Sequence, residues 1–342
     1  MPHLTRRQLL CAAMAGAAFP GLSFAARQQL VVGTWGGDFG NILKASVDDA
    51  LMEPKGIEVV QSIGAPMQRR AKLLAERNSR RGSMDVACLA DFDIHAAAGM
   101  NALAPVNEDT VARTRHVLPF LKKSHAIPHI YSAYVIVYNT DMVKTPPTSF
   151  ADLWDPKWRG RVGLCDFQYT TNTAIAAIVG GGSMSNFAPA QAKLDEMKAL
   201  DAKVLPSTEA VAVALKSGEI WFTIIAAARA YMWRKQGVPV ARIVPSEGGI
   251  PTSYEAAVPA NTRQKELAYG YLDAMLSPSA QSAFASRMGY LPTVDDVKLP
   301  EELEREINFT TQQREKMMQL DLDYLQQNQA SILDAWNKTF KG

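Results

Sequence analysis

The chain has 342 residues, with 36 lysine and arginine side chains against 34 aspartate and glutamate, so its formal net charge at pH 7 is +2. A charge this close to zero argues against a nucleic-acid partner and against adhesion to anionic lipid, because both require a surplus of basic residues. The length is sufficient for two domains of ordinary size.

The chain begins with the pattern of an export signal. Arg6 and Arg7 precede an apolar stretch at residues 11–19, and a small-residue cleavage site, Ser23-x-Ala25, follows. This order is typical of a secretory signal, and the paired arginines favour the twin-arginine route, with the general secretory route left open. We predict that residues 1–25 are removed, which lowers the basic count from 36 to 34, equal to the acidic count. No later segment is apolar for the ~20 residues that a membrane span requires, so the mature protein is expected free in the periplasm.

Apolar runs alternate with helical patterns in the first part of the mature chain. Strands are predicted at residues 30–35, 57–63 and 84–90, separated by a glycine-rich turn at 36–40 and by helices near 41–53 and at 66–82. This β-α-β-α order predicts a mostly parallel sheet with helices on both faces. The basic residues of the second helix are interpreted as a solvated face, with a docking surface as the alternative. They are Arg69, Arg70, Lys72, Arg77, Arg80 and Arg81.

A long β-rich run at residues 130–140 interrupts this order, and a second one lies at 254–260. Between them the alternation of strands and helices restarts. Strands are predicted at 161–166, up to 227 and at 241–249, and helices at 170–182, 188–200 and ahead of the strand that ends at 227. Further helices are predicted at 262–276, 278–288 and 301–337, the last with an apolar stripe through Met317, Leu320, Tyr324, Ile332 and Trp336. Two α/β units joined by two β runs predict two lobes with crossovers at 131–138 and 251–258, and a ligand site at the carboxyl ends of the strands.

No constellation for catalysis or metal binding is recognised. The motifs H-E-x-x-H, G-x-S-x-G and G-x-x-x-x-G-K-[ST] are missing, and Pro128 breaks the helix that would align His125 with His129. We therefore predict no catalytic residue, no metal and no cofactor. Cys88 and Cys165 lie in apolar runs and are predicted as buried free thiols, with a disulfide as the alternative.

Three segments together resemble the periplasmic solute-binding proteins of ABC transporters, in the branch that includes spermidine/putrescine-binding proteins. They are VVGTWGGDFG at 31–40, SFADLWDPKWRGRV at 149–162, and 243–281 followed by GYLPT at 289–293. The resemblance implies a type II-like two-lobed α/β fold, each lobe a mixed sheet flanked by helices, with two hinge strands. It implies a monomer, not an enzyme, that closes on a small solute and presents it to a membrane permease. Lobe 1 is expected at residues 26–131 plus 254–296, and lobe 2 at 135–250 plus 297–342.

Some site residues follow from the family pattern. Trp35 matches an aromatic residue that packs on ligand, with a core role as the alternative. Asp91 and Tyr290 match ligand-contacting positions, although Asp91 is equally suited to capping the next helix. The glycine-rich segment after Trp35, which contains Asp38, is expected to let a ligand approach the backbone and a helix N-terminus.

The departures from the polyamine-binding pattern indicate another solute. Phe167, Thr170 and Tyr254 stand where polyamine binders place acids, while Asp166 and Glu255 are one position away and are expected on the opposite face. Arg229 begins a helix at a strand end, where its planar guanidinium suits a carboxylate or phosphonate. Helix surface is its alternative. The predicted ligand-binding residues are Trp35, Asp38, Asp91, Phe167, Thr170, Thr171, Arg229, Tyr254 and Tyr290.

The sequence thus predicts a solute with a carboxylate or similar anionic group and an apolar or aromatic part. A polyamine is the first alternative. A secreted hydrolase or lyase and a ferric-ion binder are less favoured, since no nucleophile–base pair is found and Tyr131, Tyr134 and Tyr138 are interpreted as structural.

Overall fold

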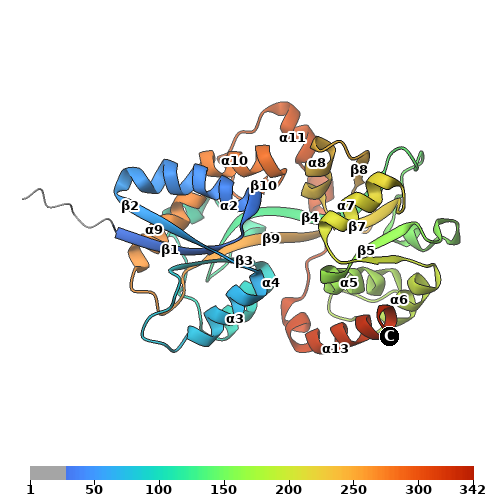
Figure 1. Ribbon diagram of the computed structural model, residues 1–342, viewed down its shortest axis with the longest axis horizontal. Helices are drawn as coiled ribbons and strands as arrows, with labels where there is room; N and C mark the ends of the chain where they lie inside the picture. The colour runs from blue at the N-terminus through green and yellow to red at the C-terminus, as the bar shows by residue number, and fades with distance from the viewer. Residues whose placement is uncertain (1–27) are drawn as a thin grey trace, which may run out of the picture.

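The computed structural model describes residues 28–342, so the predicted export signal lies outside the described residues. Two groups of strands and helices lie next to each other and are joined by long strands, as Figure 1 shows. No helix of residues 28–342 has the length and apolar character needed to cross a bilayer.

The first lobe is built on three parallel strands, β1 (Gln28–Thr34), β2 (Ile57–Ile63) and β3 (Val86–Ala90), and all three predicted strands are confirmed. Its helices are α2 (Gly37–Leu43), which a π-helix (Lys44–Met52) continues, α3 (Pro66–Glu76) and α4 (Asp91–Gly99). The predicted turn at 36–40 is wrong, because α2 begins at Gly37. Glycine is required at position 40, where an added Cβ would lie 2.6 Å from the carbonyl oxygen of Trp35.

The second lobe repeats the alternation, as predicted. Its strands are β5 (Val162–Cys165), β6 (Lys203–Leu205), β7 (Phe222–Ala226) and β8 (Val240–Ile243). Its helices are α5 (Tyr169–Val179), α6 (Ala190–Ala199), α7 (Thr208–Ser217) and α8 (Ala227–Lys235). Single 3₁₀ turns occur at Glu53–Lys55, Ala112–His116, Pro119–Leu121, Phe150–Trp154, Pro156–Trp158 and Asp166–Gln168.

Two long strands, β4 (Ile127–Asn139) and β9 (Ile250–Ala257), connect the lobes. They pair antiparallel from Ile127 opposite Ala256 to Tyr134 opposite Ile250. From Tyr134 onward, β4 pairs with β7 and β8 of the second lobe, while β9 also pairs with β3 of the first. One sheet therefore runs through the molecule in the order β2-β1-β3-β9-β4-β7-β5-β6. The two β runs expected to connect the lobes are these strands.

The C-terminal part returns to both lobes. Helices α9 (Lys265–Met275) and α10 (Pro278–Met288) precede the short strand β10 (Leu291–Pro292), which pairs with β4. The helix expected over 301–337 is instead three helices, α11 (Glu301–Ile307), α12 (Thr311–Glu315) and α13 (Leu322–Phe340). Thr310 and Asp321 cap the N-termini of α12 and α13. In the segment between these two helices, the Met318 amide donates a hydrogen bond to Gly249 O (2.9 Å). Met317 and Leu320 therefore lie outside any helix, which corrects the predicted stripe.

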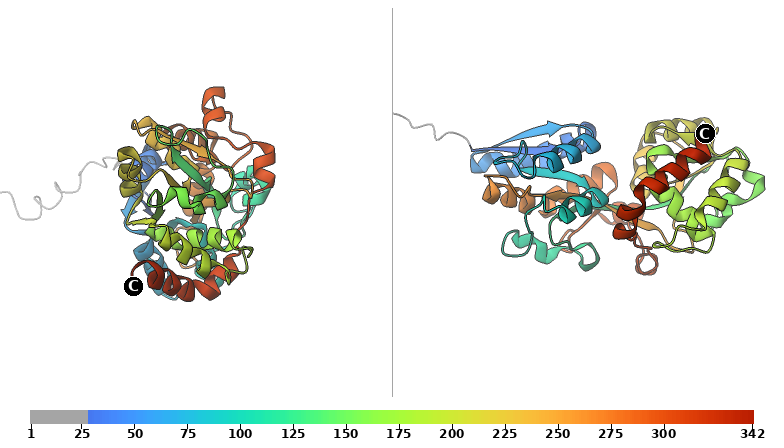
Figure 2. Two further views of the ribbon diagram at one scale, coloured as in Figure 1. Left: turned by 90° about the vertical axis from the view of Figure 1, so that its right-hand side faces the viewer. Right: turned by 90° about the horizontal axis from the view of Figure 1, so that it is seen from below.

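Helix α13 packs against the helices of the second lobe, and Figure 2 shows it lying across that lobe. Trp336 anchors it: the indole is fully buried, and its Nε1 donates to Asp166 Oδ1 (2.9 Å). Lys341 Nζ also donates to Asp166 (2.8 Å). Asp166 is thereby occupied in holding the C-terminal helix.

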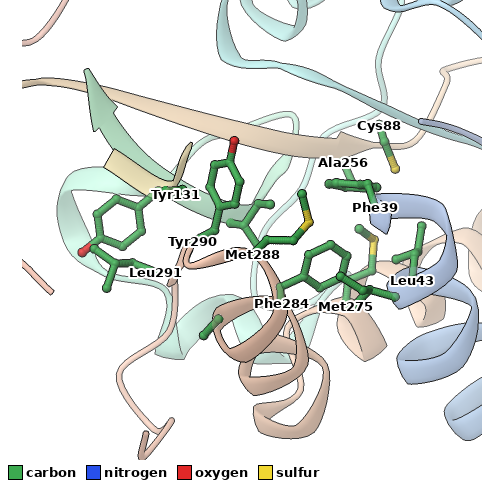
Figure 3. Packing of buried hydrophobic residues seen from close by; sticks show 14 of the residues in the cluster. Phe39, Leu43, Cys88, Tyr131, Ala256, Met275, Phe284, Met288, Tyr290 and Leu291 are labelled. Atoms are coloured by element: carbon green, nitrogen blue, oxygen red, sulfur yellow. The ribbon is translucent and has the colours of Figure 1, made fainter. Parts of the chain in front are cut away.

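The core of the first lobe is rich in aromatic and sulfur-containing side chains, several of which Figure 3 shows between α2 and α10. His129 on β4 lies among them, with its ring centroid 5.8 Å from Phe39 and 4.5 Å from Phe284. Burial lowers the pKa of His129 to about 3, so the ring is neutral. Cys88 and Cys165 are buried free thiols, as predicted.

Candidate solute-binding site

Several predicted site residues follow the carboxyl ends of strands. Trp35 follows β1, Asp91 follows β3, Phe167 follows β5 and Arg229 follows β7. Tyr254 lies on the connecting strand β9, opposite Ala90 of β3. This is the edge at which open α/β sheets bind ligands.

An aromatic group made of Trp35, Phe39, Tyr254 and Tyr290 forms the best-defined part of this edge. The ring centroid of Tyr254 lies 5.0 Å from Trp35 and 5.5 Å from Tyr290, both edge to face. Phe39 contacts Trp35 at 4.7 Å in the same geometry. Such pairs add about 0.5–1.5 kcal/mol beyond area burial, which holds the rings in fixed orientations. Burial raises the pKa of Tyr290 well above its ordinary value, so its hydroxyl stays protonated.

Arg229 lies in the first turn of α8 and interacts electrostatically with Tyr290 and Tyr254 of this aromatic group. Burial lowers the pKa of Arg229, but its interactions with Tyr290, Tyr254 and Glu209 outweigh that effect and the net shift is upward. The guanidinium is therefore charged. Within residues 28–342 it forms no ion pair, and its side-chain contact is a long one from Nη1 to Met232 Sδ (3.9 Å). A half-buried arginine of this kind can accept an anion without first breaking an existing salt bridge.

Asp91 lies at the first position of α4 and not at its N-cap, which is Ala90. Its Oδ1 accepts from the Phe92 amide (2.8 Å) and its Oδ2 from the Ser253 amide on β9 (3.4 Å). Burial raises the pKa of Asp91. The carboxyl thus connects β3 to β9 through its second oxygen, a role that the sequence does not indicate.

The remaining predicted residues lie at the beginnings of helices. Asp38 is exposed in the first turn of α2, and Phe167 is 59% exposed beside the start of α5. Thr170 and Thr171 occupy the first turn of α5, with Thr171 buried. In the described part of the chain the side chains of Asp38 and Thr170 form no hydrogen bond.

Three further residues, none of which the sequence placed among the ligand-binding residues, have notable surroundings in the structure. Burial raises the pKa of Tyr134, on β4, to about 12. Arg69 is 5% exposed, with its guanidinium carbon 4.7 Å from the Trp35 ring centroid, so the predicted solvated face of α3 is wrong at this position. Glu255 is buried on β9, where its Oε1 accepts from Ser253 Oγ (2.8 Å) and its Oε2 has no partner in residues 28–342. The pattern of charges along α3 does not indicate that Arg69 is the basic residue that is buried.

One group of side chains in residues 28–342 has the spacing of a metal site. His116 Nδ1 lies 3.0 Å from Asp295 Oδ1 and 3.9 Å from Asp296 Oδ2. Arg113 already pairs with Asp296 at 2.6 Å, and both aspartates are at least partly exposed. An incoming cation would therefore compete with a resident guanidinium.

A family model described as bacterial extracellular solute-binding protein matches residues 48–311. The chain belongs to this family. The solute-binding protein is 30% identical to the spermidine/putrescine-binding periplasmic protein of Escherichia coli K12 over 173 residues, which are 48% of this chain and 49% of that protein. That match thus spans about half the length of the curated relative. A spermidine/putrescine-binding periplasmic protein of Haemophilus influenzae is 24% identical over 273 residues, 75% of this chain and 74% of the relative.

Solved structures confirm the predicted two-lobed fold. The solute-binding protein resembles the protein described as the Atu4243-GABA receptor with a TM-score of 0.79 at 23% identity, covering 91% of this chain and 97% of that one. It resembles AgtB of Agrobacterium tumefaciens in complex with agropinic acid with a TM-score of 0.73 at 16% identity, covering 92% and 99%. It resembles the substrate-binding protein PotD of Streptococcus pneumoniae with a TM-score of 0.76 at 18% identity, covering 91% and 98%. The family and these neighbours are binding proteins and not enzymes.

Proposed function

We propose that this solute-binding protein captures a small solute with a carboxylate or similar anionic group in the periplasm and delivers it to an ABC importer. The observation that carries the proposal is Arg229, a charged, half-buried guanidinium with no ion-pair partner in residues 28–342, which interacts electrostatically with Tyr254 and Tyr290. Trp35 and Phe167 offer apolar surface for the rest of the solute. Two structural neighbours are named for GABA and agropinic acid, and both compounds carry a carboxyl group.

We further propose that the lobes close around the solute by bending at β4 and β9, near residues 131–138 and 251–258. These strands are the long sheet connections between the lobes, and rigid lobes that rotate about a few strand residues are a common closing mechanism. Lobe 1 is then residues 26–131 plus 254–296, and lobe 2 is 135–250 plus 297–342. The protein acts as a monomer that presents its closed form to the permease.

The polyamine alternative is supported by the names of the sequence relatives. A diamine buried between lobes needs paired carboxylates, because an unpaired buried charge costs about 3–5 kcal/mol. Asp166 is committed to Trp336 and Lys341. Glu255 has Lys123 Nζ at 3.8 Å. The arrangement therefore favours an anionic solute over a polyamine.

Calorimetry with the purified protein against GABA, benzoate, a phosphonate, putrescine and spermidine tests the proposal. Arg229→Ala is expected to weaken binding of the best anionic compound at least tenfold, about 1.4 kcal/mol. Lys235→Ala, which removes an exposed cation from the same helix, serves as the matched control and is expected to bind like the wild type. Micromolar binding of putrescine or spermidine that Arg229→Ala does not weaken would establish the polyamine alternative instead.

A further inference from the structure

Arg69 is a buried arginine that joins the carboxyl ends of all three parallel strands of the first lobe. Its Nη1 donates to Thr34 O at the end of β1 (2.7 Å) and to Gly64 O just after β2 (3.0 Å). Its Nε donates to Cys88 O in β3 (2.7 Å). Three carbonyl groups from three strands therefore fix one guanidinium in place, as its planar set of donors allows.

The sheet is shaped to receive this side chain. An added Cβ at Gly33 of β1 would lie 2.8 Å from Arg69 Cδ and 3.0 Å from Met84 Sδ. Cβ atoms in proteins essentially never lie within 3.0 Å of another heavy atom. Arg69 cannot move away without losing its three hydrogen bonds to carbonyl groups. Glycine at position 33 thus leaves room for the Arg69 side chain, which lies against β1.

The guanidinium fixed in this way stacks on Trp35. Its central carbon lies 4.7 Å from the centre of the indole ring, within the range of a cation–π interaction. Trp35 is half-buried, and its ring packs edge to face with the rings of Phe39 and Tyr254. One face of the indole is therefore already covered by a cation from the protein, which weakens the attraction of the ring for a second cation.

The charge of Arg69 is not neutralised by its neighbours. All three acceptors are neutral carbonyl groups, and Nη2 has no hydrogen-bond partner in residues 28–342. The acidic side chain that acts on it electrostatically, Asp93, is paired with Arg70 at 2.7 Å. Two guanidinium groups thus share one carboxylate. Burial lowers the pKa of Arg69, yet an arginine keeps its proton at neutral pH.

We propose that Arg69 positions Trp35 and sets a positive electrostatic potential at the indole, so that an anionic or neutral group is favoured over a cationic one at this wall of the site. The part that concerns solutes rests on the proposed function, in which Trp35 contacts the solute. The position of the indole and the sign of the potential do not depend on any solute.

Quenching of Trp35 fluorescence by small ions tests the sign of the potential without a solute. Iodide, caesium and neutral acrylamide are the probes, with potassium chloride holding the ionic strength constant. The emission of Trp35 is obtained as the difference between each protein and the same protein carrying Trp35→Phe. Arg69→Met is expected to lower the ratio of iodide to caesium quenching roughly threefold, since one nearby positive charge is lost. Lys72→Met removes an exposed charge from the same helix and is expected to leave the ratio unchanged.

A second variant separates charge from positioning. Arg69→Lys keeps the charge but not the planar donor set, so it is expected to retain the iodide preference while acrylamide quenching of Trp35 rises because the indole is less firmly held. An unchanged ion ratio in Arg69→Met overturns the electrostatic role. If Arg69→Met does not fold, Arg69→Lys still tests the positioning role. Acrylamide quenching and Trp35 emission equal to those of the wild type would overturn that role. Since no solute is present, either failure is distinct from failure of the calorimetric test of Arg229.

Discussion

Glu255 on the connecting strand β9 is predicted to make the protein less stable as the pH rises, and Glu255→Gln should remove that dependence. The carboxyl is buried, and its burial raises the pKa to about 8 from an ordinary value of 4.5. Lys123, whose Nζ lies 3.8 Å away, opposes the shift, and Asp91 adds to it. The native carboxyl therefore keeps its proton over a pH range in which the unfolded one has lost it.

The sign and size of the effect follow from proton linkage. Between the two pKa values the native state binds more protons than the unfolded state, so the free energy of unfolding falls as the pH rises, by about 1.4 kcal/mol per pH unit. From pH 5 to pH 7 the contribution of Glu255 is a loss of about 2–3 kcal/mol. Glu255→Gln lacks this titration, so its stability relative to the wild type should increase by that amount over the same range.

Urea unfolding followed by circular dichroism at pH 5, 6, 7 and 8 measures this difference. Glu266→Gln, which removes an exposed carboxylate from α9, is the matched control and should show no such trend. A free-energy difference between Glu255→Gln and the wild type that stays constant from pH 5 to pH 8 would refute the reasoning. It would mean that Lys123 neutralises the carboxylate fully and that Glu255 is ionised in the native protein.

Two further predictions concern the core and the hinge. His129→Phe should raise the free energy of unfolding by about 1–3 kcal/mol, because both ring nitrogens are buried without partners in residues 28–342, and chemical denaturation would show it. Because burial lowers the pKa of His129, the wild type loses stability as the pH falls below 6.5, the pKa of histidine in the unfolded chain. His129→Phe should lose less stability over the same pH range. Equal acid sensitivity of the two proteins would contradict this. Small-angle scattering should show a smaller radius of gyration when the best anionic compound of the calorimetric panel is bound, and an unchanged radius at saturation would contradict closure at β4 and β9.

The sequence by itself determined most of the order of strands and helices and the two-lobed architecture, although it did not predict β6 or the division of the C-terminal helix into three. The period of the apolar residues differs between strands and helices, so β2 and the other strands of the first lobe are found where the pattern predicts them. The chain order then restricts the topology, since parallel strands need helical connections. The buried free state of Cys88 and Cys165 also follows locally, from the apolar runs that contain them.

Only the tertiary structure decided which polar side chains turn inward. Arg69 belongs to a helix whose other basic residues look equivalent in sequence, and it is buried because three strand ends and Trp35 converge on it. Glu255 is placed opposite Lys123 by a crossing strand. Asp166 is occupied by Trp336, which lies 170 residues further along the chain. These contacts join distant segments, and local periodicity carries no information about which distant segment will cover a given face.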